Sequence, residues 1–362
     1  MKILIGGGGT GGHIYPALAL ARHALAEDSS TSILFIGSAA GLESKIVPSA
    51  GFPLKTIPAR GFQRSFKQVG PLIRDLFGGL RQSGIIIKEF QPNVVLGTGG
   101  YVAAPMVLAA LLKRYPAVIH EQNALPGLAN RLLAPLVKKV CLSFAETEKK
   151  MPPFSRVVYT GNPRASEVIA LSREEGCRCF GFDPLRKTIL IYGGSRGALK
   201  LNRVVTAYLK ENLLPENVNL IYVTGEIYYK EVAEELGSLP GGIRLYPYLD
   251  QMPEALAAAD LAVTRSGATT LAELTALGLP ALLIPSPNVV NNHQYFNARL
   301  LADAGAAVLI DENDFDSKRL QLETNRLLEE PLLLEEMSRC SRQMGVPDAA
   351  AKLYRCLQEV AS

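Results

Sequence analysis

Two stretches of the sequence combine glycine with polar side chains that could bind a phosphate and move a proton. In the first, six of the seven residues at positions 6–12 are glycine, and His13 follows directly. Such a turn lets the backbone approach a ligand closely, and a helix that begins after it offers unpaired N–H groups to an anion. Imidazole titrates near neutral pH, so His13 is the leading candidate for a general base.

The second stretch, residues 265–273, reads Arg-Ser-Gly-Ala-Thr-Thr-Leu-Ala-Glu. We expect a strand to end here and a helix to begin near Ala268, so that its first N–H groups can hold a diphosphate. Glu273 would lie about two turns into this helix, where its carboxylate could accept two vicinal ribose hydroxyls or simply face solvent. His293 and Gln294 follow where a loop passes into a helix, a position suited to binding sugar hydroxyls.

Other readings of these motifs fit less well. Gly7, Gly9 and Gly12 satisfy G-x-G-x-x-G, which predicts a nicotinamide oxidoreductase, but the second strand ends in Ile-Gly-Ser without the acid that such a fold uses for ribose. There is no Walker A sequence. The acidic pair Asp314 and Asp316 has the spacing of a metal anchor, although it is better explained as a solvated loop. We therefore predict no cofactor and no metal.

These motifs must be positioned by strands that alternate with helices, which is the pattern of a parallel α/β sheet. In the first half, strands are expected at 2–5, 32–36, 53–57, 93–96, 117–120 and 139–143, with a helix at 17–27. In the second half they are expected at 188–192, 220–223, 243–245, 261–263, 281–284 and 307–310. The strand and glycine turn of the N-terminus recur in altered form at 188–198, which predicts two similar domains.

The predicted domain boundaries follow from this repeat. We expect an N-terminal Rossmann-like domain at 1–162, a linker with a short helix at 163–187, a C-terminal Rossmann-like domain at 188–340, and a C-terminal helix at 341–362 that packs back towards the first domain. A chain of 362 residues is long enough for two such cores.

Charge is divided unevenly along the chain. The first 160 residues contain 18 lysines and arginines against 8 acidic residues, whereas the remainder contains 20 against 26. A basic half is typical of proteins that bind nucleic acid or an anionic membrane. No nucleic-acid motif accompanies it and tryptophan is absent, so we expect no nucleic-acid partner.

Three further features concern cellular location. The five cysteines contain no C-x-x-C pair and are expected to be reduced thiols, and Met1-Lys2 leads into a strand rather than a signal peptide. Residues 94–112 carry no charge over about the length of a membrane span, but their glycines and proline favour a strand, a loop and a buried helix.

Residues 66–81 have the composition of a segment that lies in a lipid headgroup layer. Alternatively, their apolar residues form the core face of a helix between two strands. The residues that we assign to a membrane surface are Phe66, Leu72, Ile73, Leu76 and Phe77, with the cations Arg74 and Arg81.

Taken together, six motifs resemble the MurG family, the bacterial peptidoglycan glycosyltransferases that add N-acetylglucosamine to a lipid-linked N-acetylmuramoyl-pentapeptide. They run in the family's order from the N-terminus towards the C-terminal helices. They are Gly-Thr-Gly-Gly-His at 9–13, Gly-Gly-Tyr-Val at 99–102, His-Glu-Gln-Asn at 120–123, Gly-Gly-Ser-Arg-Gly-Ala at 193–198, residues 265–273, and His-Gln at 293–294.

The resemblance implies an α/β glycosyltransferase B fold, in which two Rossmann-like domains face an interdomain cleft. It implies that UDP-N-acetylglucosamine binds mainly to the C-terminal domain. The donor residues it implies are Ser195, Ala268 and Thr269 at the diphosphate, Glu273 at the ribose, Leu249 near the uracil and Gln294 at the sugar. Thr10, Gly11, Gly12 and Asn123 would complete the site, with the first glycine turn holding the acceptor's lipid diphosphate.

The implied reaction is an inverting displacement, in which the C4 hydroxyl of the acceptor attacks the anomeric carbon as UDP leaves. His13 would take the proton, or it would instead orient the acceptor diphosphate. Glu121 is the second candidate for the base, although it could equally support the loop at Asn123. The resemblance also implies peptidoglycan synthesis, with roles in the cell wall, cell shape and cell division, by a peripheral protein on the cytoplasmic face of the bacterial membrane.

Two departures limit this transfer. Arg164 directly follows Pro163, where a common form of the family has an intervening valine, so Arg164 receives no donor role. His293-Gln294 replaces a Gln-Gln pair, and only Gln294 is carried over. The alternatives are a diacylglycerol glycosyltransferase of the same fold, a nicotinamide oxidoreductase, and a non-catalytic sugar-nucleotide-binding or membrane-scaffold protein.

Overall fold

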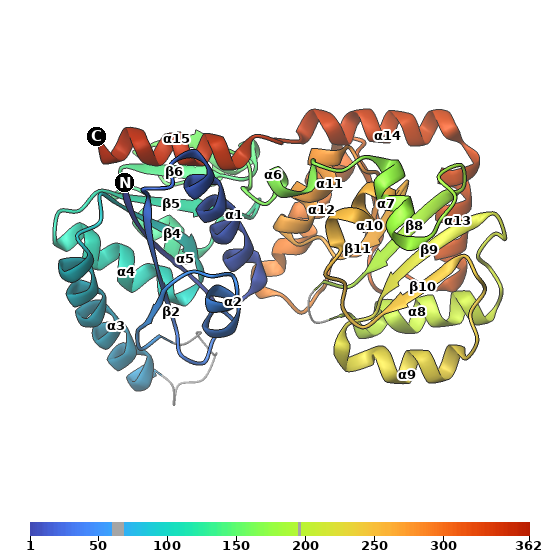
Figure 1. Ribbon diagram of the computed structural model, residues 1–362, viewed down its shortest axis with the longest axis horizontal. Coiled ribbons are helices and arrows are strands. Elements are labelled where there is room, and N and C mark those ends of the chain that lie inside the picture. The colour runs from blue at the N-terminus through green and yellow to red at the C-terminus, as the bar shows by residue number, and fades with distance from the viewer. Residues whose placement is uncertain (60–68, 195–196) are drawn as a thin grey trace. The chain divides into compact units, whose positions relative to one another are not determined.

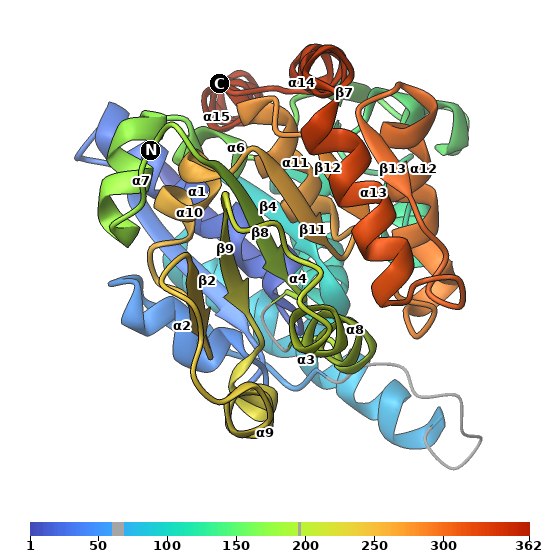
Figure 2. The same cartoon turned by 90° about the vertical axis from the view of Figure 1, so that its right-hand side faces the viewer.

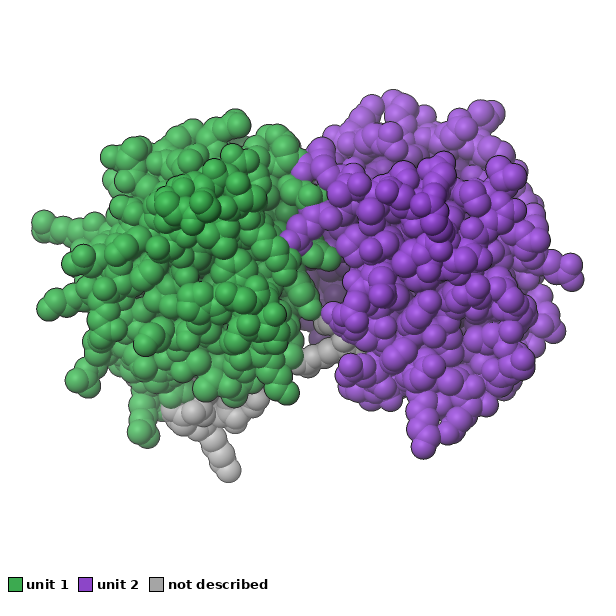
Figure 3. All heavy atoms as spheres, in the orientation of Figure 1, with its two compact units in different colours: residues 1–166, 348–362 green, residues 167–347 purple. Residues whose placement is uncertain are grey.

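The protein comprises two compact units, each built on one parallel sheet. The computed structural model describes residues 1–59, 69–194 and 197–362, without the side chains of residues 69 and 71–73. Unit 1 contains Met1–Ser166 and Asp348–Ser362, and unit 2 contains Glu167–Pro347 (Figure 3). Helices cover both faces of each sheet (Figures 1 and 2).

In unit 1 the described strands form a 7-stranded parallel sheet in the order β3-β2-β1-β4-β5-β6-β7. Its strands are β1 (Lys2–Gly7), β2 (Ser32–Gly37), β3 (Leu54–Thr56), β4 (Val94–Gly99), β5 (Ala117–Glu121), β6 (Lys139–Leu142) and β7 (Val157–Tyr159). Its helices are α1 (Gly11–Glu27), α2 (Glu43–Ser49), α3 (Val69–Phe90), α4 (Gly100–Leu112), α5 (Leu128–Leu133), the 3₁₀ turn η2 (Ala145–Lys150) and α15 (Ala349–Ala361), with α6 (Ala165–Val168) at the boundary.

Alternation along β1 explains why helices cover both faces of this sheet. Ile3 and Ile5 pack in one core with residues of α1 and α15. Leu4 points to the opposite face and packs with residues of α3, α4 and α5. Because side chains alternate across a strand, a continuous apolar run can only be buried if both faces are covered.

Unit 2 repeats this architecture with a 6-stranded parallel sheet in the order β10-β9-β8-β11-β12-β13. Its strands are β8 (Lys187–Tyr192), β9 (Val218–Val223), β10 (Ile243–Tyr246), β11 (Leu261–Thr264), β12 (Ala281–Leu283) and β13 (Ala307–Leu309). Its helices are α7 (Arg173–Phe180), α8 (Leu199–Lys210), α9 (Glu226–Leu236), α10 (Met252–Ala258), α11 (Ala268–Leu277), η3 (Val290–Asn292), α12 (His293–Asp303), α13 (Ser317–Glu329) and α14 (Pro331–Met344).

Every strand expected from the sequence is present, with ends within about three residues of those predicted. The first helix differs, because α1 begins at Gly11 rather than at residue 17. Thr10 has an extended backbone and the amides of His13 and Ile14 already bond to its carbonyl, so the last glycines of the turn form the first helical turn. His13 therefore lies on the helix itself.

The uncharged stretch at 94–112 forms β4 and α4, as predicted; β4 is buried, and most of α4 packs in the core of unit 1 while its last residue, Leu112, is exposed. Across residues 1–59, 69–194 and 197–362, no helix combines the length and apolarity that a bilayer span requires.

The boundary between the units does not follow the predicted linker at 163–187. Residues from Glu167 onward belong to unit 2, where α7 packs closely on α10: a Cβ at Gly176 would lie 2.5 Å from the carbonyl oxygen of Glu254. At the other end, α15 belongs to unit 1 and packs on α1, while α14 belongs to unit 2. The chain thus contributes its last helix to the core of its first unit.

Removing the side chain of Leu357 tests this packing. Leu357 on α15 is fully buried in the core it shares with α1, so Leu357→Ala should lower the free energy of unfolding by about 2–5 kcal/mol, measured by urea denaturation. The control is Leu332→Ala on α14, where the side chain is 82% exposed and the change should stay within about 0.5 kcal/mol. Equal effects of the two substitutions would contradict the packing of α15.

Candidate active site

The first candidate site lies at the carboxyl ends of β1 and β4. These strands are neighbours, yet the chain leaves them towards opposite edges of the sheet, and such a switch point is where open α/β sheets bind ligands. A shift in register pairs Gly7 with Gly99. Gly100 has φ +76°, and a Cβ there would lie 2.2 Å from the carbonyl oxygen of Gly8. Only glycine permits this approach of the two turns.

A buried carboxylate that the sequence analysis did not identify braces the glycine turn. Glu43, on α2, accepts hydrogen bonds from the amide of Gly9 at 2.9 Å and from the amide and hydroxyl of Ser38 at 2.8 Å each. It is the first acid after β2 and is fully buried. Because its oxygens are bonded to these groups, Glu43 does not replace the ribose acid of a nicotinamide enzyme.

His13, in the first turn of α1, is fixed at both its backbone and its ring. The hydroxyl of Thr98 donates to the His13 carbonyl oxygen at 2.9 Å, and His13 Nδ1 lies 3.1 Å from Oε1 of Gln122. Gly99 leaves room for the ring, since a Cβ there would be 2.6 Å from Nδ1. Thr10, Gly11 and Gly12 lie beside His13 at the partly exposed start of the helix, where N–H groups attract an anion.

Glu121 has the geometry of a loop support rather than of a base. Its carboxylate is only 3% exposed. One oxygen accepts from the amide and side chain of Asn123, at 2.9 and 3.4 Å, and the other accepts from the Gly127 amide at 2.9 Å and from Asn130 at 2.8 Å. These bonds shape the loop after β5 and place Asn123 beside it. We therefore assign Glu121 to loop support, and His13 remains the candidate base.

The second candidate site lies at the corresponding switch point of unit 2, between β8 and β11. After β11, α11 begins at Ala268 with Gly267 as its N-cap, and a glycine has no side chain that could cap the helix. Ala268 is buried and Thr269 is partly exposed at this helix start. Gly193, Gly194 and Gly197 follow β8, the adjacent strand, and Gly194 and Gly197 have positive φ angles.

Glu273 is not a solvated helix glutamate. Glu273 is only 6% exposed. It lies one and a half turns beyond the start of α11. Burial and the neighbouring Glu273 carboxylate raise the pKa of Tyr192, at the end of β8, so that this phenol stays neutral. A buried carboxylate on a helix that begins with a glycine N-cap fits a ligand with a diphosphate and hydroxyl groups.

Gln294 and Leu249 occupy defined positions in the same unit. The Ser266 hydroxyl, after β11, donates to the Gln294 carbonyl oxygen at 2.8 Å, and Oε1 of Gln294 accepts from the Ser286 amide at 2.9 Å. The side-chain NH₂ of Gln294 is thus the group it can offer to a sugar. Leu249 follows β10 and is buried.

Several residues of the sequence motifs make structural contacts. Arg265 bonds to the Ile284 carbonyl oxygen at 3.0 Å and forms an ion pair with Glu312. Asp316 caps α13 by accepting from the Arg319 amide at 2.7 Å, which gives this member of the predicted acidic loop a structural role. His293 Nδ1 lies 2.9 Å from the Val290 carbonyl oxygen. The guanidinium of Arg164 lies 5.7 Å from the centre of the Tyr15 ring in unit 1.

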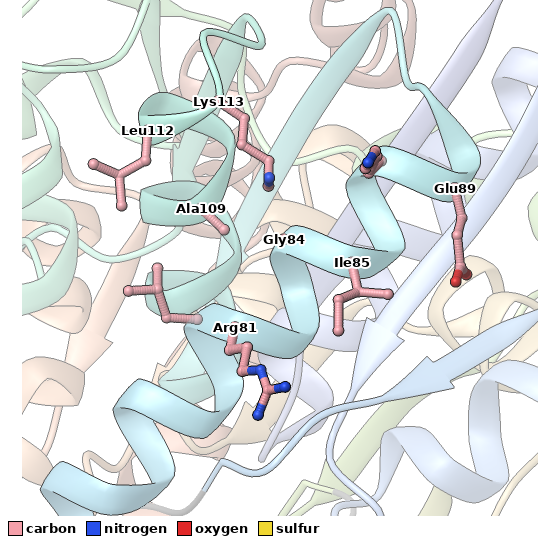
Figure 4. Close-up of a pocket in the computed structure, with 9 residues that line it drawn as sticks. Arg81, Gly84, Ile85, Glu89, Ala109, Leu112 and Lys113 are labelled. Atoms are coloured by element: carbon pink, nitrogen blue, oxygen red, sulfur yellow. The ribbon is translucent and has the colours of Figure 1, made fainter.

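The predicted membrane segment corresponds in part to α3. Leu76 and Phe77 are exposed, with 66% of Phe77 accessible, so they do not belong to a core face, whereas Leu80 is partly buried. Arg74 and Arg81 are exposed on the same helix. A groove of about 810 Å³ runs between α3 and α4 (Figure 4), and its lining residues are Leu80, Arg81, Gly84, Ile85, Lys88, Glu89, Ala109, Leu112 and Lys113.

Some predicted residues lie outside the described part of the chain. They are Phe66, Ser195 and the side chains of Leu72 and Ile73. Of the others, the structure groups Thr10, Gly11, Gly12, His13, Glu121 and Asn123 at one switch point of unit 1, and Ala268, Thr269, Glu273 and Gln294 around α11 in unit 2. It adds Glu43, Thr98 and Gln122 to the first group; only Gln122 lay within a motif that the sequence analysis singled out.

Comparisons with known proteins match the two units to two family domains. The glycosyltransferase family 28 N-terminal domain matches residues 3–142 and the family 28 C-terminal domain matches residues 188–353. The chain is 45% identical over 365 residues, covering 100% of both chains, to the UDP-N-acetylglucosamine–N-acetylmuramyl-(pentapeptide) pyrophosphoryl-undecaprenol N-acetylglucosamine transferase of Halalkalibacterium halodurans. It is 43% identical to the enzyme of that name from Bacillus subtilis, covering 99% of each chain.

A solved structure shows the same fold over the whole chain. The crystal structure of Acinetobacter baumannii MurG is 29% identical, superimposes with a TM-score of 0.77 and covers 99% of both chains. Two parallel-sheet units, the two matching family domains and end-to-end identity above 40% lead to one conclusion. The chain is a glycosyltransferase and belongs to the UDP-N-acetylglucosamine–N-acetylmuramyl-(pentapeptide) pyrophosphoryl-undecaprenol N-acetylglucosamine transferase family.

Proposed function

We propose that the protein transfers N-acetylglucosamine from UDP-N-acetylglucosamine to the C4 hydroxyl of undecaprenyl-pyrophosphoryl-N-acetylmuramoyl-pentapeptide, with inversion. This reaction belongs to peptidoglycan synthesis and hence to the growth and division of the cell wall. The observation that carries the proposal is the extent of the similarity, which covers both units. The sequence similarity therefore includes the motifs that we assign to the donor in unit 2 and those that we assign to the acceptor in unit 1.

Unit 2 supplies the donor site in this proposal. The amides at the start of α11 and in the turn at 193–198 bind the diphosphate and stabilise the charge that develops on it as UDP departs. Glu273 accepts hydrogen bonds from the two ribose hydroxyls, the backbone at Leu249 faces the uracil, and Gln294 donates to a hydroxyl of N-acetylglucosamine. Preorganised amides can stabilise a leaving diphosphate by themselves.

Unit 1 supplies the acceptor site and the base. The start of α1, with Thr10, Gly11 and Gly12, binds the lipid diphosphate, and Asn123 contacts the acceptor from the loop after β5. The acceptor's C4 oxygen forms a bond to the anomeric carbon, the bond from that carbon to the donor diphosphate breaks, and His13 takes the hydroxyl proton. UDP carries away the electron pair, so charge and atoms balance.

An acceptor assay tests the reaction. Purified protein incubated with UDP-N-acetylglucosamine and the muramoyl-pentapeptide lipid should release UDP and lengthen the lipid by one sugar, detected by mass spectrometry. A diacylglycerol acceptor presented in the same vesicles should remain unmodified. Transfer to diacylglycerol, or donor binding without transfer to the muramoyl lipid, would refute the acceptor assignment.

Glu273 provides a test of the donor site. Glu273→Gln should raise KM for UDP-N-acetylglucosamine about 10- to 100-fold, because two charge-assisted hydrogen bonds to the ribose weaken. With a donor whose ribose lacks the 2′-hydroxyl, the difference in KM between parent and variant should be smaller, because one of the two hydrogen bonds to Glu273 is already missing. The control is Glu323→Gln, a second buried helix glutamate of unit 2 that pairs with arginines; it should leave KM unchanged. Equal KM changes for both donors would contradict the ribose contact.

We further propose that α3 and the end of α4 dock on the membrane that holds the acceptor. A polyprenyl-linked substrate must be met at a bilayer surface, and here exposed apolar side chains lie among cations. The apolar groups are Leu76, Phe77, Ile85 and Leu112, and the cations are Arg74, Arg81, Lys88 and Lys113. Apolar insertion and attraction to anionic headgroups together give stable, reversible binding. The protein would then be peripheral on the cytoplasmic face.

Vesicle binding tests this surface. Phe77→Ser should weaken binding to phosphatidylglycerol vesicles about 10-fold or more, since burying a phenylalanine contributes about 1.5–3 kcal/mol. Arg81→Gln should weaken it about 5-fold, an effect that high salt removes. Ile227→Ser on α9 of unit 2, where the side chain is 76% exposed, is the matched control and should bind as the parent does. Loss of binding by the control alone would contradict the assignment.

A further inference from the structure

A hydrogen-bond network in unit 1 fixes the orientation of one side-chain amide. Gln122, immediately after β5, is almost fully buried. Its Nε2 atom lies 2.6 Å from the carbonyl oxygen of Thr98 and 3.2 Å from that of His120. A carbonyl oxygen can only accept, so the atom facing it must be the NH₂ group. The reversed amide would place two oxygens 2.6 Å apart, and it is therefore excluded.

This orientation determines the tautomer of His120. Nδ1 of His120 lies 3.0 Å from the Gln122 NH₂ group and must therefore accept, while Nε2 lies 2.9 Å from the Gly161 carbonyl oxygen and must therefore donate. The ring satisfies both contacts only as the neutral Nε2–H form. Burial, together with the nearby His13 ring, lowers the pKa of His120 to about 4 despite its bond to Gly161. His120 thus stays neutral at the pH of the cell.

The same orientation determines the tautomer of His13. With NH₂ facing Thr98 and His120, the oxygen Oε1 of Gln122 faces His13 Nδ1 at 3.1 Å. An amide oxygen only accepts, so Nδ1 must carry a proton. In the neutral ring the lone pair then lies on Nε2. Gly99, whose Cβ would lie 2.6 Å from Nδ1 and 3.4 Å from Oε1, keeps this contact open.

We propose that Gln122 is a positioning residue that holds His13 as the Nδ1–H tautomer, so that Nε2 accepts the proton of the acceptor hydroxyl. The inference rests on the proposed role of His13 as the base. In other sites with a catalytic histidine, an acidic side chain orients the imidazole ring. Gln122 has this position here, but its side chain is neutral. It therefore selects the tautomer without adding a negative charge beside the base. His120 and Thr98, in turn, fix the amide of Gln122.

Tautomers are observed directly by long-range ¹H–¹⁵N spectra of protein labelled with ¹⁵N-histidine. The chain has only four histidines, and His13→Gln assigns the signals of His13. In the parent, neutral His13 should show a protonated Nδ1 and an unprotonated Nε2, and His120 should show the opposite pattern. In Gln122→Met, His13 should move towards the Nε2–H form. An Nε2–H tautomer of His13 in the parent would overturn the proposal.

Kinetics provide the second readout. Gln122→Met should lower kcat about 100-fold, because the proton of neutral His13 then lies on Nε2, the atom that must accept. KM for each substrate should stay within about 3-fold of the parent value, because the substrates still bind. Gln122→Glu keeps an acceptor for Nδ1–H but replaces the NH₂ group with an oxygen that faces the carbonyl oxygen of Thr98 and Nδ1 of His120, so it should not restore kcat. Gln82→Met is the matched control: it removes another amide-to-backbone bond in unit 1, from Gln82 to Thr56 at 3.0 Å, and kcat should not change.

The outcomes separate the inference from the proposed function. UDP binding to unit 2 and the thermal midpoint of Gln122→Met verify that the variant is folded; if it is not, the parent spectrum carries the test. Unchanged kcat in folded Gln122→Met would overturn the role of Gln122. Unchanged kcat in His13→Gln would instead refute His13 as the base, while the parent spectrum would still report whether Gln122 sets the tautomer.

Discussion

The close approach of two backbone turns is the constraint on which the candidate base depends. Strands β1 and β4 are paired through their last glycines, and the turns that follow come so near that a Cβ at Gly100 would overlap the carbonyl of Gly8. This contact places the first turn of α1 against the end of β4. His13 is then reached by the Thr98 hydroxyl, and its ring fits only because residue 99 is also glycine.

Buried polar groups fix this arrangement. A carboxylate, an amide and an imidazole are each costly to bury unless their hydrogen bonds are made. Glu43 braces the glycine turn, Glu121 braces the loop that carries Asn123, and Gln122 bridges His13 and His120. Each group has donors and acceptors in a fixed order. One hydrogen bond of such a network cannot change without disturbing its neighbours. The side chains of the site therefore have one orientation before any substrate binds.

The two units use one architecture for different chemistry. In both, the candidate site is at a switch point between neighbouring parallel strands. In unit 1 the helix start is followed at once by an imidazole, whereas in unit 2 the helix start is followed after one and a half turns by the buried carboxylate of Glu273. The first combination suits proton removal beside an anion, and the second suits a diphosphate joined to a sugar with vicinal hydroxyls.

The sequence alone determined the strands, the two-fold repeat of the α/β pattern and the identity of the motif residues, because apolar periodicity and glycine turns are local signals. It also placed His13, Glu273 and Gln294 near helix starts. Only the tertiary structure decided that Glu121 supports a loop, that Asp316 caps a helix and that Phe77 is exposed. Likewise, Glu43 and Gln122 acquired their roles from residues 34 and 109 positions away in the chain. A hydrogen bond between distant residues depends on strand order and burial, and neither is encoded in local spacing.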